Sequence, residues 1–342
     1  MQASVCYEVK KAFTLGTIPE YLNTTLITLI PKCDNLESLA NYRSISLCNS
    51  MYKIITKVLV ARIRPFLHNL ISPIQTAFVP RRRGVDNVLI AQELIYTMDR
   101  MKGREGYMAV KVDLEKAYDR LEWSFIHKVL QAFCFPPNLI KIIMSCISTT
   151  SISLLVNGSA LEAFNPSRGI RQGDPLSPYL FIMCMEYLGY LIEEKCAKGL
   201  WCPLKASRGN IKISHLFFAN DLILFAKVNT ENCIAISEVL RTFCKESSQK
   251  ISCEKSRIYF SSNVGVDLKE SACERLGMFE TTNFGKYLGF PLRHKGAPWG
   301  QFNFVADPIM KKLAGWKTKF QSFAGKAVLV KSVMSAIPNH VM

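Results

Sequence analysis

Two short apolar runs joined by a polar turn constrain the fold of this chain more than any other feature. The first run is His215-Leu216-Phe217-Phe218, the second is Leu222-Ile223-Leu224-Phe225, and Ala219-Asn220-Asp221 lies between them. Apolar runs of this length on either side of a short polar turn are typical of a β-hairpin. A carboxylate at the tip of a hairpin is held on a rigid element, which suits a metal ligand. We therefore predict that Asp221 lies at a hairpin tip.

The composition indicates a globular protein with a polyanionic partner. The chain has 342 residues, of which 49% are hydrophobic and 20% are charged. These values exclude a disordered chain and suggest two or three subdomains. The formal net charge is +16 and the sequence pI is near 9.3. Nucleic acid is the first expected partner of so basic a protein. The alternative is a basic protein without such a partner.

The cysteine spacing and the lengths of the apolar runs indicate the cellular compartment of the protein. The twelve cysteines form no C-x-x-C pair and no zinc-type spacing, so we expect reduced thiols. No signal peptide opens the chain, and no apolar run reaches the roughly 18–20 residues that cross a bilayer. We predict an intracellular protein of the nucleus or cytoplasm with no membrane partner. A helical pattern is already under way at Val5, so we also expect a piece of a longer protein.

Periodicity predicts most of the secondary structure. Residues 24–31 are β-branched and apolar, as in a strand. Residues 107–113 alternate as a strand that ends at Asp113. Ser177-Pro178 is predicted to be the N-cap and first helical position of a helix that reaches about Cys196. The other predictions are a helix from Met51, a strand at 151–157 closed by an Asn157-Gly158 hairpin turn, a helix at about 230–247, and short strands at 256–262 and 286–290.

Asp113 and Asp221 are candidates for a shared metal site. Each would lie at the end of a predicted strand, and the hard cation Mg²⁺ prefers carboxylate oxygens. Two such ions about 3.5–4 Å apart can stabilise the attacking and leaving oxygens of a displacement at phosphorus. That chemistry needs at least two carboxylates brought together from separate strands. A strand-end aspartate is more often a turn or cap residue, so each aspartate alone is weak evidence.

Three blocks occur in an order that resembles the reverse transcriptases of plant non-LTR (LINE-type) retrotransposons. They are residues 113–119 (Asp-Leu-Glu-Lys-Ala-Tyr-Asp), 172–178 (Gln-Gly-Asp-Pro-Leu-Ser-Pro) and 218–221 (Phe-Ala-Asn-Asp). The resemblance implies an α+β right-hand polymerase fold, with fingers, a palm on an antiparallel sheet, and a partial helical thumb. The implied division is an N-terminal extension and fingers at 1–105, a palm at 106–292 with a return to the fingers at about 120–170, and the start of the thumb at 293–342.

The resemblance assigns the catalytic roles to four positions. Asp113 and Asp221 would bind the metal ions, two Mg²⁺ ions being expected in an active enzyme and Mn²⁺ being possible. Lys255 would protonate the leaving pyrophosphate. Asn220 occupies the position of the first aspartate of the catalytic hairpin. The implied partners are an RNA template, a DNA primer and deoxynucleoside triphosphates.

Five further positions would contact the nucleotide. By the same resemblance, Tyr118 would sit under the nucleotide sugar, and Lys32 and Arg43 would meet the triphosphate. Gln172 can hydrogen-bond a nucleotide or a template edge, and Gly173 permits close backbone approach to a ligand. Each of these residues also has an ordinary structural interpretation, as a packed aromatic ring, a surface base or a turn residue.

Asn220 is the departure that limits the enzymatic prediction. Asparagine offers one neutral carbonyl oxygen where the family has a carboxylate, so the site loses a negative charge. We expect a polymerase fold with little or no polymerase activity, in a truncated or degenerate copy of an element. Further departures are Ser44, where the family usually has proline, and Ser247 or Ser248, where it has glycine.

Other functional readings remain open from the sequence. One is a catalytically dead nucleic-acid binder, another is a group II intron maturase, which shares the Gln-Gly block, and a third is a relic without activity. The run Arg81-Arg82-Arg83 is either a solvated loop or a phosphate contact.

Overall fold

The structure is a computed structural model, and it describes residues 2–32, 35, 37–206, 211–292, 307, 310, 322–329 and 331. The predicted thumb at 293–342 lies outside the described residues, apart from helix α13 (Phe323–Leu329) and a few single positions. None of the helices in the described ranges has the length and apolar character needed to span a bilayer.

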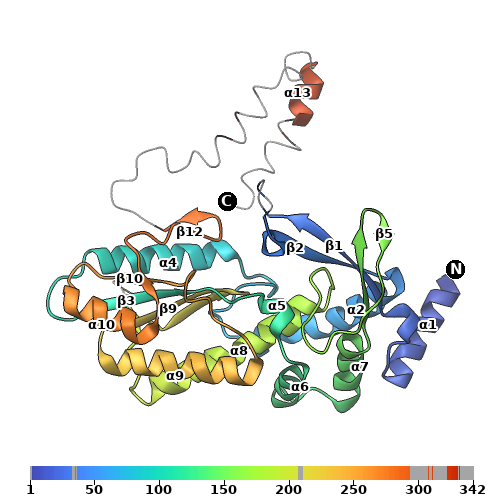
Figure 1. Cartoon of the computed structure of the whole chain (residues 1–342), viewed down its shortest axis with the longest axis horizontal. Coiled ribbons are helices and arrows are strands. Elements are labelled where there is room, and N and C mark those ends of the chain that lie inside the picture. Colours follow the sequence, from blue (N-terminus) through green and yellow to red (C-terminus); the bar gives the residue numbers. More distant parts are fainter. Residues whose placement is uncertain are drawn as a thin grey trace.

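A five-stranded sheet forms one half of the molecule (Figure 1). Its order is β11-β10-β3-β9-β8, and all neighbours are antiparallel except β10 and β11. Helix α4 covers one face, while α8, α9 and α10 lie on the other. Since both faces are covered, β9 is buried along its interior, which explains its continuous apolar sequence. The bounds are β3 Tyr107–Val112, β8 His215–Phe218, β9 Asp221–Lys227, β10 Arg257–Phe260, β11 Phe279–Glu280, α4 Gly84–Asp99, α8 Ser177–Ala197, α9 Thr230–Ser247 and α10 Val266–Leu276.

A four-stranded sheet forms the other half, in the order β2-β1-β4-β5. Strands β1 and β2 are antiparallel, and β4 joins β1 in parallel. The chain leaves the five-stranded sheet after β3, builds α5, α6, α7, β4 and β5, and returns through α8. The bounds are α1 Gln2–Leu15, β1 Thr24–Pro31, β2 Tyr42–Cys48, α2 Ser50–Ile63, α3 Leu67–Leu70, α5 Ala117–Arg120, α6 Trp123–Ala132, α7 Pro137–Ser148, β4 Ser151–Val156 and β5 Ser159–Ala160.

One continuous apolar core joins the two halves. It contains Ile55 and Leu59 of α2, Phe125 of α6 and Phe181 of α8, all nearly inaccessible to solvent. A second cluster fills the space between α4 and the five-stranded sheet. The β12–β13 hairpin contributes Tyr287 to this second cluster. The remaining short elements are η1 Glu20–Leu22, η2 Leu39–Asn41, η3 Arg64–Phe66, β6 Leu204–Lys205, β7 Lys212–Ile213, β12 Lys286–Tyr287 and β13 Phe290–Pro291.

The sequence predictions of local structure are confirmed at several elements. The strand at 24–31 and the helix at 230–247 are found with the predicted bounds. The Asn157-Gly158 turn joins β4 to β5, and both of its residues have a positive φ, as a two-residue hairpin turn of type I′ requires.

Two local predictions are wrong. Ser177 is not the N-cap of α8, because Leu176 occupies that position and the Asp174 Oδ1 atom accepts the Leu176 N–H at 2.9 Å. The predicted strand at 286–290 is a hairpin of β12 and β13 instead. Its turn residues Leu288 and Gly289 have φ values of 50° and 87°, which a single strand does not contain.

Candidate active site

The two candidate carboxylates face each other at one end of the five-stranded sheet. Strands β3 and β9 pair Val112 with Leu222, and the next residues along the two antiparallel strands are Asp113 and Asp221. Residues directly opposite each other on neighbouring strands share a face of the sheet. Burial raises the pKa of the Asp221 carboxyl, the Lys111 ammonium group lowers it, and the Asp113 carboxylate raises it. The two carboxylates therefore interact electrostatically.

The hairpin of β8 and β9 closes through a two-residue turn, Ala219-Asn220. Phe218 pairs with Asp221 across it. Ala219 has a φ of 52°, the positive value found at the first position of a type II′ hairpin turn. Asn220 is exposed and directly precedes Asp221 in the chain. The predicted hairpin is confirmed, with Asp221 as the residue that opens β9.

The loop that carries Lys255 is attached to the backbone of Asp113. The Asp113 N–H donates to the Ser256 Oγ atom at 3.1 Å, and the Ser252 N–H donates to the Asp113 carbonyl at 2.9 Å. Lys255 is exposed on the turn between these two serines. Ser248 has a φ of 57° after helix α9, so it occupies the backbone position that favours glycine.

Tyr118 packs between the start of α5 and helix α8. Its ring stacks on Phe181 with 4.8 Å between the ring centroids, and burial raises its pKa to about 12. The Ile170 N–H donates to the Tyr118 carbonyl at 2.9 Å, which ties this residue to the loop that holds Gln172. Much of the Tyr118 side chain is therefore packed in the interior, as expected for a structural aromatic residue.

The Gln172-Gly173 loop lies against strand β2. The Ser46 N–H donates to the Gln172 carbonyl at 2.7 Å. Gly173 has a φ of 109°, and a Cβ atom there would lie 2.7 Å from the Ser46 carbonyl oxygen. The close backbone approach predicted for Gly173 is thus an approach to β2, so this glycine needs no ligand to explain it.

Lys32 and Arg43 lie at the end of the β1–β2 pair where the segment that connects the two strands leaves and returns. Arg43 is paired with Ile30, and the Lys32 N–H donates to the Asn41 carbonyl at 2.8 Å, two residues further along β1. The two basic residues are therefore diagonal neighbours on one face of the hairpin. Desolvation raises the pKa of Asp119, and the charges of Lys116 and Lys32 lower it. The Lys32 end of the hairpin thus acts electrostatically on the segment that follows Asp113.

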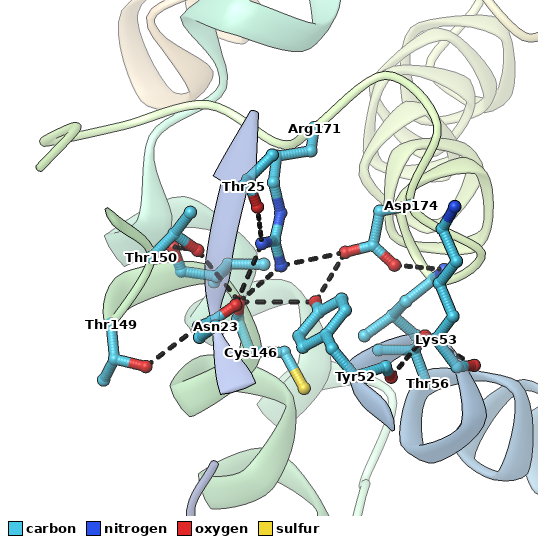
Figure 2. A network of polar contacts seen from close by, with 12 residues as sticks. Asn23, Thr25, Tyr52, Lys53, Thr56, Cys146, Thr149, Thr150, Arg171 and Asp174 are labelled. Carbon is cyan, nitrogen blue, oxygen red and sulfur yellow. Dashed lines mark hydrogen bonds and ion pairs between the residues drawn. The ribbon is translucent and has the colours of Figure 1, made fainter. Parts of the chain in front are cut away.

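A buried polar network surrounds Arg171, and sequence reasoning missed it (Figure 2). The Nη1 atom of Arg171 donates to Asn23 Oδ1 at 2.9 Å and to Thr25 Oγ1 at 2.8 Å. Its Nη2 atom donates to the Cys146 carbonyl at 2.9 Å and lies 3.2 Å from Asp174 Oδ2. The side chains of Arg171 and Asp174 are 7% and 1% exposed, so the ion pair is removed from water.

Tyr52 completes the network from helix α2. Its hydroxyl donates to Asp174 Oδ2 at 2.6 Å, and the guanidinium of Arg171 lies over its ring, 4.2 Å from the centroid. The network thereby joins the loop before α8 to β1, α2 and α7. The signal in the sequence was an arginine and an aspartate that flank Gln172-Gly173 at a spacing of three.

The middle residue of the Arg81-Arg82-Arg83 run has a structural role. The Arg82 guanidinium donates to the carbonyls of Ile71 and Gln75, both at 2.7 Å, and to that of Ser72. Arg81 and Arg83 are exposed. The hydrogen bonds of Arg82 give it a structural role, while for Arg81 and Arg83 a solvated loop and a phosphate contact both stay predictions.

Glu186 of helix α8 is a partly buried carboxyl beside this segment. It accepts the Ser72 N–H at 3.0 Å, and burial raises its pKa from 4.5 to about 7. Because the folded chain keeps this proton where the unfolded chain has released it, the free energy of unfolding falls as the pH rises from about 4.5 to about 7.

We expect Glu186→Gln to remove this pH dependence. At pH 8 the variant should be more stable than the wild type by roughly 1–3 kcal/mol, and the difference should shrink toward pH 5. Urea unfolding at both pH values measures it. Glu254→Gln, at an exposed turn position, is the control and should leave the pH profile unchanged. A difference for Glu186→Gln that does not vary with pH would contradict the assignment.

The acidic residues at this end of the sheet suit a hard divalent cation. Over the described ranges, no group of three or more His, Cys, Asp or Glu side chains could hold a metal ion. The carboxylate oxygens of Asp113 and Asp221 are of the type that Mg²⁺ prefers. Asn220, which precedes Asp221 in the chain, has a neutral carbonyl oxygen, and this is a weaker metal ligand than a carboxylate.

Comparison with known proteins shows the family to which the chain belongs. Residues 30–292 match the family model described as reverse transcriptase (RNA-dependent DNA polymerase). The chain is 26% identical over 332 residues to a transposon TX1 protein of Xenopus laevis, covering 95% of this chain and 24% of that protein. It is 28% identical over 212 residues to the Pol polyprotein of the type-2 retrotransposable element R2DM of Drosophila melanogaster, covering 62% of this chain and 19% of that protein.

Among solved structures, a telomerase from Candida albicans aligns with a TM-score of 0.49 and 12% identity, over 76% of this chain and 46% of that chain. The family match spans most of the chain and includes the whole five-stranded sheet. The chain belongs to the reverse transcriptase family, and its α+β architecture is the right-hand polymerase fold. It spans about a quarter or less of the length of the two retroelement proteins described above.

Proposed function

We propose that this chain is the RNA-directed DNA polymerase domain of a non-LTR retrotransposon, with catalysis impaired by Asn220. The observation that carries the proposal is the pairing of Asp113 opposite Asp221 at the end of β3 and β9, with asparagine as the neighbouring turn residue. A plant LINE-type origin is part of the proposal. It is supported by 45% identity over 67 residues to an uncharacterized mitochondrial protein of Arabidopsis thaliana.

The carboxylates of Asp113 and Asp221 would hold divalent cations, Mg²⁺ or Mn²⁺. Two such ions, when bound, stabilise the attacking and leaving oxygens of nucleotidyl transfer. Lys255 would act as the proton donor to the leaving pyrophosphate, since its loop is hydrogen-bonded to the Asp113 backbone. The substrates would be deoxynucleoside triphosphates and a DNA primer on an RNA template.

The nucleotide would be bound from two sides. Lys32 and Arg43, neighbours on one face of the β1–β2 hairpin, would contact the triphosphate. Tyr118 would exclude a 2′-hydroxyl, held in place by its stacking on Phe181. Gln172 would hydrogen-bond the nucleotide or the template, on a loop fixed by the contact of Gly173 with β2.

We also propose the subdomain division. The fingers would comprise the N-terminal extension up to residue 105 with the return at about 120–170, and the palm would comprise 106–292. Helix α4 falls before residue 105 but packs on the five-stranded sheet, so it would act as part of the palm. Residues 293–342 would begin the thumb.

A second candidate function is nucleic-acid binding without chemistry. Asn220 favours it, because the site lacks one of the negative charges that two divalent cations need. The net charge of +16 supports binding in either case. In the first function the Asp113–Asp221 pair is needed for primer extension, whereas in the second it has no catalytic role.

Asp113→Asn tests the proposal through two measurements on the same protein. Affinity for an RNA–DNA primer–template should stay close to that of the wild type and fall steeply with salt, because phosphate contacts dominate it. Slow primer extension by the wild type in Mn²⁺ should be lost in the variant. Salt-independent binding would overturn the nucleic-acid role, and extension that survives Asp113→Asn would overturn the catalytic assignment.

A further inference from the structure

An extended segment at residues 74–76 covers the outer edge of strand β8. The Phe217 N–H donates to the Ile74 carbonyl at 3.1 Å, and the Thr76 N–H donates to the Phe217 carbonyl at 3.2 Å. These bonds make a parallel bridge between Gln75 and Phe217. Although β8 is the last strand in the order of its sheet, it is therefore held on both of its edges.

The side chain of Gln75 reaches from this segment into the hairpin turn. Gln75 is 1% exposed, and its Oε1 atom accepts the N–H groups of Ala77 and Ala219, both at 3.1 Å. Two backbone donors fix the orientation of the amide, because the Nε2 atom cannot accept a hydrogen bond. The Nε2 atom itself is buried with no hydrogen-bond partner among the described residues. Gln75 therefore contacts the hairpin turn through its Oε1 atom.

Ala219 needs support of this kind. Its φ of 52° is sparsely populated for a residue with a Cβ atom, and such conformations persist where the surroundings hold them. Ala219 is buried, so without Gln75 its N–H would lose its acceptor away from water. Asn220 and Asp221 follow directly, so a movement of the turn shifts the Asp221 carboxylate relative to Asp113 on the neighbouring strand.

We propose that Gln75 is a positioning residue for the carboxylate pair: its oxygen holds the Ala219 turn and so fixes Asp221 opposite Asp113. The metal-binding part of this inference rests on the proposed function. The geometric part does not, because it concerns the hydrogen bond to the turn alone.

Hydrogen exchange of the Ala219 amide tests the geometric part. Gln75→Met keeps the length of the side chain but removes the acceptor, and exchange at Ala219 should become at least about tenfold faster. Gln75→Glu keeps an acceptor oxygen and should preserve protection. Gln92→Met removes a different glutamine bond, from Nε2 to the Pro291 carbonyl at 2.9 Å, and should leave Ala219 unaffected.

Binding of Mn²⁺ alone, followed by electron paramagnetic resonance, tests the positioning of the carboxylates. In the Asn220→Asp background, Gln75→Met should weaken Mn²⁺ binding about tenfold. Gln75→Glu and Gln92→Met should not weaken it. A purely structural role for Gln75 would lower stability without this selective loss of metal affinity.

The outcomes separate the two proposals. Unchanged exchange at Ala219 in Gln75→Met overturns the positioning role. Faster exchange with unchanged Mn²⁺ affinity shows that the turn does not control the carboxylates, which also overturns it. Mn²⁺ binding that is indifferent to Asp113→Asn overturns the proposed function instead, and the exchange result then still decides whether Gln75 holds the turn.

Discussion

Replacement of Asn220 by aspartate should raise the rate of primer extension in Mg²⁺ by about 10²–10⁴ over the wild-type chain. The substitution places a carboxylate at the turn position next to Asp221. This turn lies at the end of the sheet where Asp113 and Asp221 are opposite each other. A change in the outer ligand sphere typically alters metal affinity or activity about 10–100-fold, and a direct ligand should matter at least as much. Primer extension on an RNA template, with wild type and variant side by side, measures the ratio.

A charge-matched control separates a local effect from a general one. Asn229→Asp adds the same charge at the N-cap of helix α9, where the Asn229 side chain accepts the Asn232 N–H at 2.8 Å. Aspartate is as good an N-cap as asparagine, so stability and activity should not change. In Mn²⁺, which tolerates looser ligation, the gain from Asn220→Asp should be smaller. Vigorous extension by the wild type in Mg²⁺ would refute the prediction that Asn220 impairs catalysis.

The second large effect concerns the buried ion pair of Arg171 and Asp174. We expect Arg171→Met to lower the free energy of unfolding by about 3–5 kcal/mol, because it leaves the Asp174 carboxylate buried without its cation. The same change also removes the Arg171 N–H groups that donate to Asn23 Oδ1, Thr25 Oγ1 and the Cys146 carbonyl. Urea or guanidinium unfolding of the purified variant gives the value.

A double variant tests whether the uncompensated charge is the cause. Arg171→Met with Asp174→Asn should recover about 1–3 kcal/mol of the loss, since the amide oxygen can still accept the Leu176 N–H. Arg168→Met is the control, because its contact with Glu122 is long and exposed and should contribute less than about 1 kcal/mol. A loss of stability in Arg171→Met no larger than in Arg168→Met would contradict a structural role for the network.

The sequence predicted those parts of the site that depend on the pattern of apolar and polar residues along a short segment. The hairpin of β8 and β9 follows from two apolar runs and a short turn, and Asp113 follows from the end of an alternating strand. Family resemblance then supplied the expectation that the two carboxylates meet. The register of β3 and β9 agrees with that expectation, although the roles of the individual site residues remain proposals.

Long-range contacts explain what the sequence did not predict. Arg171 reaches Asn23 and Thr25, which lie 148 and 146 residues away in the chain, and no local pattern indicates such partners. The same holds for Gln75, whose acceptor role depends on Ala219, 144 residues away. The predicted approach of the Gly173 backbone to a ligand stays a prediction, and the close neighbour that the folded chain reveals is the backbone of β2.

The position of β3 in the middle of its sheet has a consequence during synthesis of the chain. Both of its neighbours, β9 and β10, are encoded far downstream, because the excursion through α5 to β5 lies between them and β3. While the polypeptide emerges from the ribosome, the apolar β3 segment has no strand partner until β9 has been made, and its second edge stays unpaired until β10 follows. An unpaired apolar strand invites association with other chains, so a message interrupted before β10 would yield a product prone to aggregate rather than a smaller working domain.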